Sequence, residues 1–476
     1  MMNDISQMPL VETLFAAARE RFSFHMPGNR HGQSFPRWLR DNLWSLDTTE
    51  LAQTGDIQNP TGKVQQAMDL AASFFGAGHT RFVTTGTTTS LLTALATACP
   101  CGSELILPRR VHQTLLHGTA LLNLTPIWAE ILEGEQIEQA LLRTLKSNPQ
   151  ARALFVTSPG YDGRTVCLTE LAQLADRYGT IIIVDEAHGS HFAAAPDLLP
   201  PSALAQGADL VAMSAHKTLP ALTPASYLHI GQKALAAGKV EADKLGRMLK
   251  VFQTSSPSFV IAATLDYARW WLERDGRQAV EDLLALIADL DRDLPPAIKR
   301  IQLPGSDPLR LTYDYSRTGL SRPEVNAIFD AGRVDPELVD LTRIILIPAL
   351  DTNQAETKAL ASVLRTIGSA APGAVRAQIG YAAPAEDALF DQAPPSAVPV
   401  GEVLFGDLKK TAIPLAEAGG RIAAEALVPY PPGIALVWPG EIITADRIAA
   451  IKRFLAAGIT VYGVHDPDSD SVVVLK

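Results

Sequence analysis

A lysine stands among small and hydroxyl-bearing residues in the stretch MSAHKTLPAL, residues 213–222. The apolar run ADLVAM precedes it, so Lys217 follows the end of an expected buried strand. A lysine whose pKa is lowered by burial and positive neighbours can form a Schiff base with a carbonyl group. Ser214 and His216 could bind a phosphate of the same ligand. Taken alone, the pattern also fits a solvated lysine in an ordinary loop.

An aspartate follows four β-branched residues in IIIVDEAHGSH, residues 181–191. A carboxylate at that strand end is costly to bury unless it meets a cation, and a protonated pyridine nitrogen would be one. Asp185 could instead cap a turn or bind a metal, but the phosphate-binding loop G-x-x-x-x-G-K-[ST] is absent from the sequence. His188 and His191 lack a third cluster of ligands, so we expect no metal site.

Hydroxyl groups surround Gly86 in TTGTTTSLLTAL, residues 84–95, where an expected helix begins. Backbone N–H groups and hydroxyls at a helix N-terminus can bind phosphate, although a Thr-rich cap with nothing bound fits equally well. His112, in RRVHQTLLHG, could stack on an aromatic ligand or could be an ordinary core or surface histidine. A phosphate cup, an acid for a pyridinium and a lysine for an aldehyde together meet the requirements of pyridoxal 5'-phosphate.

The elements that must position these residues alternate between residues 64 and 230. RALFVTSPG and TIIIVDEAHG have the β-branched composition of buried parallel strands, and TELAQLADRYG between them has helical spacing. We therefore expect an α/β fold whose mostly parallel sheet is covered by helices, with ligand groups at the carboxyl ends of the strands.

The second half of the chain predicts a further layer of structure. A long helix is expected from about Phe259 to Leu294, followed by strands in RIQLPGSDPLRLTYDYS and LVDLTRIILIPAL and by two helical segments. APAEDALFDQAPPSAVPV has the composition of a linker or crossover. We expect an N-terminal arm (residues 1–50), a large cofactor-binding domain (51–297) and a smaller C-terminal α+β region (298–476).

The overall composition excludes several classes of protein. The 476 residues carry a formal net charge of -10 and no long basic run, which argues against nucleic acid or anionic membrane as the main partner. No uncharged run is long enough to span a bilayer and no secretory signal is evident, so the cytoplasm is expected. Three cysteines suit a reduced compartment, and Cys99 and Cys101 are expected to be buried thiols.

Eight motifs, running from Phe24 to Glu441, resemble the ornithine/lysine/arginine decarboxylase family of fold type I pyridoxal-phosphate enzymes. The resemblance is to the shorter bacterial forms that lack an N-terminal receiver-like domain. The motifs occur in family order: FHMPGNRHG, FGAGHTRFVTTGTTTS, PRRVHQTLLHG, SPGYDG, VDEAHGSHF, SAHKTLPALTPAS, QTSSPSFVIAATLDYAR and ALVPYPPGIALVWPGE.

The resemblance implies a role for each matching position. Lys217 would hold the cofactor, Asp185 would pair with its pyridine nitrogen and His112 would stack on its ring. The other cofactor-binding positions are Thr85, Gly86, Thr87, His188, Ser214 and His216, with Ser255 and Ser256 approaching from a second subunit.

Three departures from the family pattern fall near the expected site. The chain has PGNRHG where members usually have PGHKGG, so that Asn29 and Arg30 replace a histidine and a lysine. Thr223-Pro224 replaces a Ser/Thr-Gln pair, and DIQNPTG replaces D-L-H-x-P-x-G. The first and third changes put the identity of the substrate, rather than the chemistry, in question.

The resemblance implies decarboxylation of a basic L-amino acid (arginine, lysine or ornithine) to an amine and CO2, through an external aldimine and a quinonoid. Such a reaction belongs to polyamine biosynthesis. Glu337 and Asp340, and less strongly Asp314, are candidates to bind the distal cation of the substrate. The alternatives are an aminotransferase or aldolase of the same fold and a non-catalytic regulatory paralogue. A homodimer or higher homo-oligomer is expected.

Overall fold

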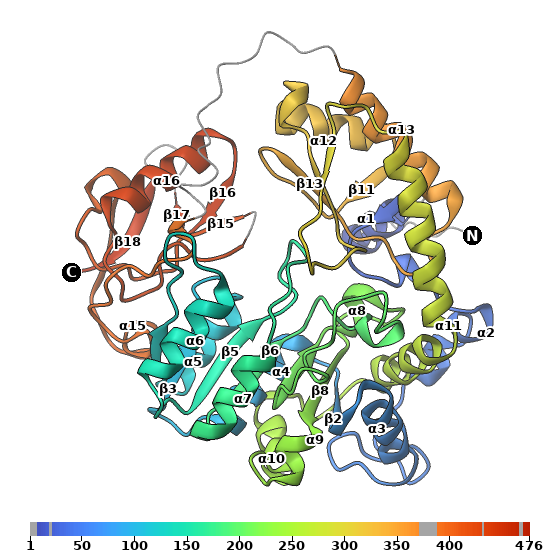
Figure 1. Ribbon diagram of the computed structural model, residues 1–476, viewed down its shortest axis with the longest axis horizontal. Coiled ribbons are helices and arrows are strands. Elements are labelled where there is room, and N and C mark those ends of the chain that lie inside the picture. The colour runs from blue at the N-terminus through green and yellow to red at the C-terminus, as the bar shows by residue number, and fades with distance from the viewer. Residues whose placement is uncertain (1–6, 19–20, 371–387, 431–432, 466–469) are drawn as a thin grey trace.

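The computed structural model describes residues 7–18, 21–370, 388–430, 433–465 and 470–476 (Figure 1). A seven-stranded sheet forms the centre of its larger part, with strand order β2-β8-β7-β6-β5-β3-β4. All neighbouring strands are parallel except β8, which runs antiparallel to both β2 and β7. The strands are β2 (Ala77–Val83), β3 (Glu104–Leu107), β4 (Thr125–Trp128), β5 (Ala153–Thr157), β6 (Ile181–Asp185), β7 (Leu210–Met213) and β8 (Ser226–Gly231).

Helices cover both faces of this sheet because its strands are apolar on both sides. Ile182 and Val184 of β6 belong to one buried cluster, whereas Ile181 and Ile183 belong to another. The first face is covered by α3 (Gly62–Phe75), α6 (Ile137–Ser147), α7 (Thr169–Tyr178) and α11 (Phe259–Arg292). The second is covered by α4 (Gly86–Ala98), α5 (Gln113–Leu121), α9 (Gln232–Ala236) and α10 (Ala242–Phe252). Because successive side chains of a strand point to opposite faces of the sheet, Asp185 faces the same side as Ile181 and Ile183, where α4 and α5 lie.

A second, antiparallel sheet with order β12-β13-β10-β9 lies beyond α11 in the chain. The N-terminal segment joins this part of the molecule, because β1 (Phe22–Phe24) pairs in parallel with β11 (Val334–Pro336). The other elements are β9 (Lys299–Ile301), β10 (Leu311–Asp314), β12 (Leu338–Val339), β13 (Arg343–Leu346), α12 (Arg322–Ala331) and α13 (Gln354–Ser369).

The C-terminal part, red in Figure 1, lies near β3, α5 and α6 of the large sheet. It contains α15 (Val400–Phe405), β14 (Lys410–Pro414), β15 (Val428–Tyr430), α16 (Ala445–Ala456), β16 (Thr460–Tyr462), β17 (Val464–His465) and β18 (Ser471–Leu475). Among the described helices, none combines the length and the apolar character that crossing a membrane requires.

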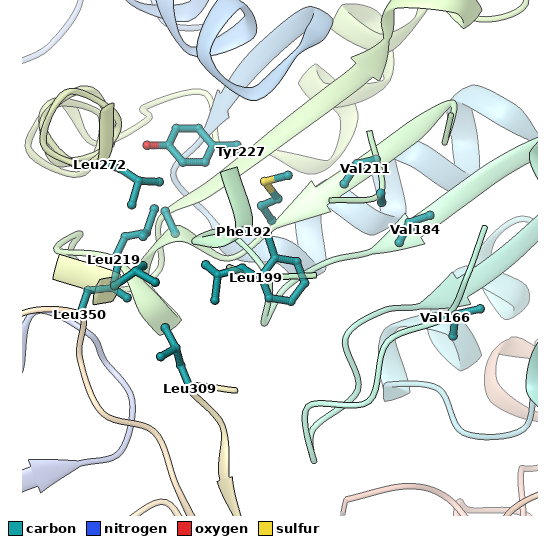
Figure 2. Packing of buried hydrophobic residues seen from close by; sticks show 14 of the residues in the cluster. Val166, Val184, Phe192, Leu199, Val211, Leu219, Tyr227, Leu272, Leu309 and Leu350 are labelled. Atoms are coloured by element: carbon teal, nitrogen blue, oxygen red, sulfur yellow. The ribbon is translucent and has the colours of Figure 1, made fainter. Parts of the chain in front are cut away.

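One apolar cluster joins the large sheet to the second sheet. Figure 2 shows Leu309 and Leu350, from the second part, in the same cluster as Leu219, which follows Lys217 in the chain. The segment carrying Lys217 is therefore packed between two parts of the molecule that are distant in sequence.

The expected strands and helices are confirmed, including the long helix α11. The expected linker, residues 383–400, lies partly outside the described residues, and from residue 388 to α15 it is mainly loop. The prediction of a buried Cys101 is wrong, because this residue lies in an exposed turn between α4 and β3, whereas Cys99 is buried. The domain boundaries after residues 50 and 297 stay predictions.

Candidate active site

A cavity of about 960 Å³ opens at the carboxyl ends of β5, β6 and β7. Residues from all three parts of the chain line it, including Phe390 and Phe454 from beyond the second sheet. The cavity brings together most residues expected from the sequence: Thr85, Gly86, Thr87, His112, Asp185, His188, Ser214, His216, Lys217 and Asp340.

Lys217 lies in the short helix α8 (Ala215–Thr218), directly after β7. Its Nζ is 3.0 Å from Nε2 of His188. Burial lowers the pKa of Lys217, Asp185 raises it, Arg310 lowers it further, and Glu337 opposes that change. Because desolvation has the largest effect, the side chain favours the uncharged, nucleophilic amine more than a surface lysine does.

Asp185 ends β6, and the residue is only 6% exposed. Its Oδ1 accepts a hydrogen bond of 3.0 Å from the N–H group of Ala187. The carboxylate also acts on its neighbours, since its charge raises the pKa of both Lys217 and His112 against the lowering caused by burial. The neighbouring strands β6 and β7 thus deliver an acid and a lysine to one cavity.

Hydroxyl groups gather where α4 begins. The Oγ1 of Thr87 lies 2.5 Å from Oγ of Ser214 and 3.2 Å from Oγ of Ser226. Thr85 Oγ1 is buried without a hydrogen-bond partner among the described residues. Gly86 has a φ of 87° and would bring a Cβ within 3.2 Å of Pro224, so a side chain is disfavoured there. Sequence reasoning missed Ser226, which is the first residue of β8.

Two histidines have their ring orientation fixed by the backbone. His112 caps α5, and its Nδ1 accepts a 3.2 Å hydrogen bond from the N–H group of Thr114. His216 Nδ1 donates to the carbonyl oxygen of Ala225 at 2.9 Å. Burial lowers the pKa of both rings, so both favour the neutral form.

The substrate-binding residues expected from the sequence already have partners. Asp340 accepts hydrogen bonds from the N–H groups of Thr342 and Arg343, and pairs with Arg343 Nε at 2.8 Å. Glu337 accepts from the hydroxyl of Tyr161 and, at 3.0 Å, from the N–H group of Met26. Their role in binding a substrate stays a prediction.

Ser255 and Ser256 do not line the cavity within this chain and are exposed. Their expected approach to the cofactor of a second subunit stays a prediction. Asp314, the weaker candidate, accepts from the N–H group of Ser316 and does not line the cavity.

The three departures from the family pattern occupy distinct places. Arg30 pairs with Asp351 at 2.7 Å and with Glu356 at 2.5 Å, which ties the N-terminal arm to the start of α13. Pro224 lines the cavity against Gly86. Gln58 Nε2 donates to the carbonyl oxygen of Thr254 at 2.6 Å, next to the two serines.

Arg310 is a site residue that sequence reasoning missed, because its segment was interpreted only as a strand. Arg310 is 4% exposed, and its Nη2 is 3.0 Å from Nδ1 of His188. Nε and Nη1 of the same guanidinium are buried without partners among the described residues. Its position, distant in sequence from every strand of the large sheet, left no local signal.

Among the described residues, no group of three His, Cys, Asp or Glu side chains is placed to hold a metal ion. The sheet order, the lysine after β7 and the aspartate at the end of β6 define a fold type I enzyme that uses pyridoxal 5'-phosphate.

Comparison with known proteins identifies the family. Residues 8–302 match the model of the Orn/Lys/Arg decarboxylase major domain, and residues 404–461 match its C-terminal domain. The chain belongs to this family and is an amino acid decarboxylase.

Similar proteins extend over nearly the whole chain. An arginine decarboxylase from Bacillus subtilis is 32% identical, over 97% of this chain and 96% of its own. One from Bacillus anthracis is 29% identical, over 96% and 95%. The solved structure of the constitutive lysine decarboxylase of Escherichia coli has a TM-score of 0.74 at 20% identity, covering 99% of this chain and 82% of that one. This last likeness confirms the fold.

The described residues fit the cofactor. Thr85 contributes a buried hydroxyl that no other described residue contacts by a hydrogen bond, at the N-terminus of a 13-residue helix that begins with Gly86. That arrangement suits a phosphate. Lys217 and Asp185 suit the aldehyde and the pyridine nitrogen.

Proposed function

We propose that this enzyme decarboxylates a basic L-amino acid and releases the corresponding amine and CO2. The observation that carries the proposal is the convergence of Lys217, Asp185 and the Thr85 hydroxyl on one cavity. The arginine decarboxylases that resemble the chain over nearly its full length make arginine the first substrate to test, before lysine and ornithine.

The bound cofactor supplies an electron sink for the pair of electrons that CO2 leaves behind. Lys217 would hold the cofactor's aldehyde, and Asp185 would keep its pyridine nitrogen protonated. His112, whose ring favours the neutral form because burial lowers its pKa, would lie over the face of the cofactor ring. The hydroxyl groups of Ser214, Thr85 and Thr87 would donate hydrogen bonds to the phosphate.

Protons at the reacting carbon would be handled by Lys217. Its Nζ lies 3.0 Å from His188 Nε2, and burial lowers its pKa. The amine therefore gives up a proton more readily than a surface lysine does, which suits the protonation step that follows loss of CO2.

The distal cation of the substrate would be bound by Glu337 or Asp340. Glu337 is supported by its influence on Lys217, since its charge raises the lysine pKa. Asp340 lines the cavity itself, but a substrate cation would have to compete with Arg343. Binding the distal cation in this way would orient the substrate, so that the bond to the carboxylate is held in the reactive position.

We propose that the enzyme acts in the cytoplasm, in polyamine biosynthesis. We also propose that it forms a homodimer in which Ser255 and Ser256 of each subunit reach the partner's cofactor. A dimer measured by light scattering supports this arrangement, and a monomer that retains full activity contradicts it.

The test uses purified enzyme supplied with pyridoxal 5'-phosphate and separately with arginine, lysine and ornithine. Amine and CO2 should form in equal amounts from one of the three, and Lys217→Ala should abolish both. A keto acid in place of CO2, or no turnover of any basic amino acid, contradicts the proposal. Lys233→Ala, at the exposed Lys233 of α9, is the matched control and should leave turnover unchanged.

A further inference from the structure

The imidazole of His188 bridges two basic side chains. Its Nε2 is 3.0 Å from Lys217 Nζ, and its Nδ1 is 3.0 Å from Arg310 Nη2. His188 is 7% exposed and Arg310 is 4% exposed, so water competes little for these contacts. A neutral imidazole has one donor and one acceptor nitrogen, so both contacts can be hydrogen bonds only if one neighbouring side chain donates and the other accepts.

The contact with Arg310 decides the protonation state of the ring. A guanidinium has only N–H donors and no acceptor, so Arg310 Nη2 must donate and His188 Nδ1 must accept. This excludes the doubly protonated imidazolium and the tautomer with a proton on Nδ1. The single ring proton must then be on Nε2, from which it points to Lys217.

The state of Lys217 follows from that of the ring. An Nε2–H group donates, so Lys217 Nζ must accept through a lone pair, which only the uncharged amine has. An ammonium at the same place would face the Nε2–H group with a proton of its own. The contact therefore favours the amine over the ammonium.

We propose that Arg310 is a positioning residue that holds His188 in its Nε2–H tautomer, and that His188 in turn selects the uncharged amine of Lys217. The tautomer follows from geometry alone. Its consequence for the reaction rests on the proposed function of Lys217. Arg310 thereby contributes to the chemistry without contacting Lys217 through any hydrogen bond of its own.

The electrostatics around the ring agree with this assignment. Burial has the largest effect and lowers the pKa of His188 well below its usual range, and the charge of Arg310 acts in the same direction. His112 and His216 act in the same direction.

Three further side chains surround the contacts between Lys217, His188 and Arg310. The ring of Tyr161 meets the ring of His188 edge-on, with centroids 5.6 Å apart. Two carboxylates, Asp185 and Glu337, oppose the trend by raising the pKa of Lys217. Without a directional contact at Nδ1, these acids would favour the ammonium, which would donate to Nε2 of the other tautomer.

The first experiment reads the tautomer in the wild-type protein without cofactor, by NMR of protein labelled with [15N]histidine. His188→Asn assigns the signal. Nε2 should have the shift of a protonated ring nitrogen and Nδ1 that of an unprotonated one, throughout the range from about pH 6 to 9. The opposite tautomer, or an imidazolium near neutral pH, overturns the proposal.

The second experiment measures the pH dependence of Lys217 acylation in cofactor-free protein by mass spectrometry. Arg310→Met should raise the lysine pKa by roughly one unit, which lowers its reactivity about tenfold at neutral pH. Arg310→Lys, which keeps a donor and a charge, should restore part of the effect. Arg300→Met is the matched control, because Arg300 contacts Asp291 and Pro308 instead.

A double-mutant cycle separates the hydrogen bond from the charge of Arg310. In a His188→Phe background, Arg310→Met should shift the lysine pKa much less. An equal shift in both backgrounds overturns the proposal, because Arg310 would then act through its charge alone. Enzyme that turns over no basic amino acid, yet shows the expected tautomer and pKa changes, would contradict the proposed function and leave this inference intact.

Discussion

Gly28 lies directly against the backbone of Leu219, two residues after Lys217. Its N–H group donates to the carbonyl oxygen of His216 at 2.8 Å, and a Cβ at Gly28 would stand 2.9 Å from the carbonyl oxygen of Leu219. The N-terminal arm therefore supports the turn that holds the lysine. Asn29 strengthens this contact, with its Nδ2 2.9 Å from the carbonyl oxygen of Ala221.

Gly28→Ala should impair the enzyme by displacing this turn. The added methyl group meets backbone atoms, which cannot rotate away, so we expect a loss of about 1–3 kcal/mol of stability and a clear fall in kcat. Urea unfolding and steady-state kinetics measure both. Gly246→Ala in α10 is the control, since its Cβ would meet nothing closer than 4.0 Å, and it should be neutral or stabilising. Equal behaviour of the two variants would disprove the contact.

Thr85→Val should weaken cofactor binding without destabilising the cofactor-free protein. The buried Thr85 hydroxyl has no hydrogen-bond partner among the described residues, so its removal should not destabilise the cofactor-free protein, whereas the lost phosphate contact should weaken cofactor binding by about tenfold. Thr93→Val, within α4, removes another buried hydroxyl that has no partner in the described part of the chain, and it should leave the affinity unchanged. Titration with pyridoxal 5'-phosphate, followed by absorbance, measures the cofactor affinity of both variants. An unchanged affinity for Thr85→Val would remove this residue from the phosphate site.

Arg109 and Glu441 form a buried pair between the large sheet domain and the C-terminal part. Two hydrogen bonds of 2.6 and 2.8 Å join them, and Trp128 and Trp438 flank the guanidinium at 4.9 and 5.3 Å. Arg109→Met leaves a buried carboxylate without its cation, so we expect a loss of roughly 3–5 kcal/mol.

The matched comparison for this pair is Arg143→Met, which breaks a more exposed pair with Glu135 and should cost below about 1 kcal/mol. Urea unfolding gives both values. A similar, small loss for the two variants would mean that the buried pair does not secure the C-terminal part.

Glu186, next to Asp185, should make the stability depend on pH. Burial raises the pKa of Glu186 to about 8 from its ordinary value of 4.5. The folded state then binds more protons than the unfolded state between these values, so the free energy of unfolding should fall as the pH rises from about 4.5 to 8.

Glu186→Gln removes this titration while keeping an oxygen that can accept from the N–H group of Ala203. The variant should therefore gain stability relative to the wild type at pH 8 but not at pH 4.5. Urea unfolding at both pH values tests this, and a constant difference would show that Glu186 is ionised throughout.

The sequence predicts those parts of the site that depend on a local pattern. Lys217 and Asp185 each follow an apolar strand, and neighbouring parallel strands end at the same edge of a sheet, so their proximity could be expected. The fold class, the family and the long helix α11 were predicted for the same reason.

Contacts between distant segments could not be predicted in this way. Arg310 reaches His188 from the second sheet, and Gly28 reaches Leu219 from the N-terminal arm, yet neither segment has a pattern that names its partner. The burial of Cys101 was wrongly expected because composition does not place a turn at the surface. The pairing of the candidate acid Asp340 with Arg343 could not be predicted either, because it depends on a local backbone conformation that the sequence does not determine by itself.

Borohydride reduction of the cofactor-loaded enzyme, followed by peptide mass spectrometry, tests the central claim most directly. Reduction fixes the cofactor permanently to the lysine that holds it. We expect one pyridoxyl group per chain, on the peptide that contains Lys217. A pyridoxyl group on another lysine, or none after loading, would contradict the assignment of Lys217 as the cofactor-binding lysine.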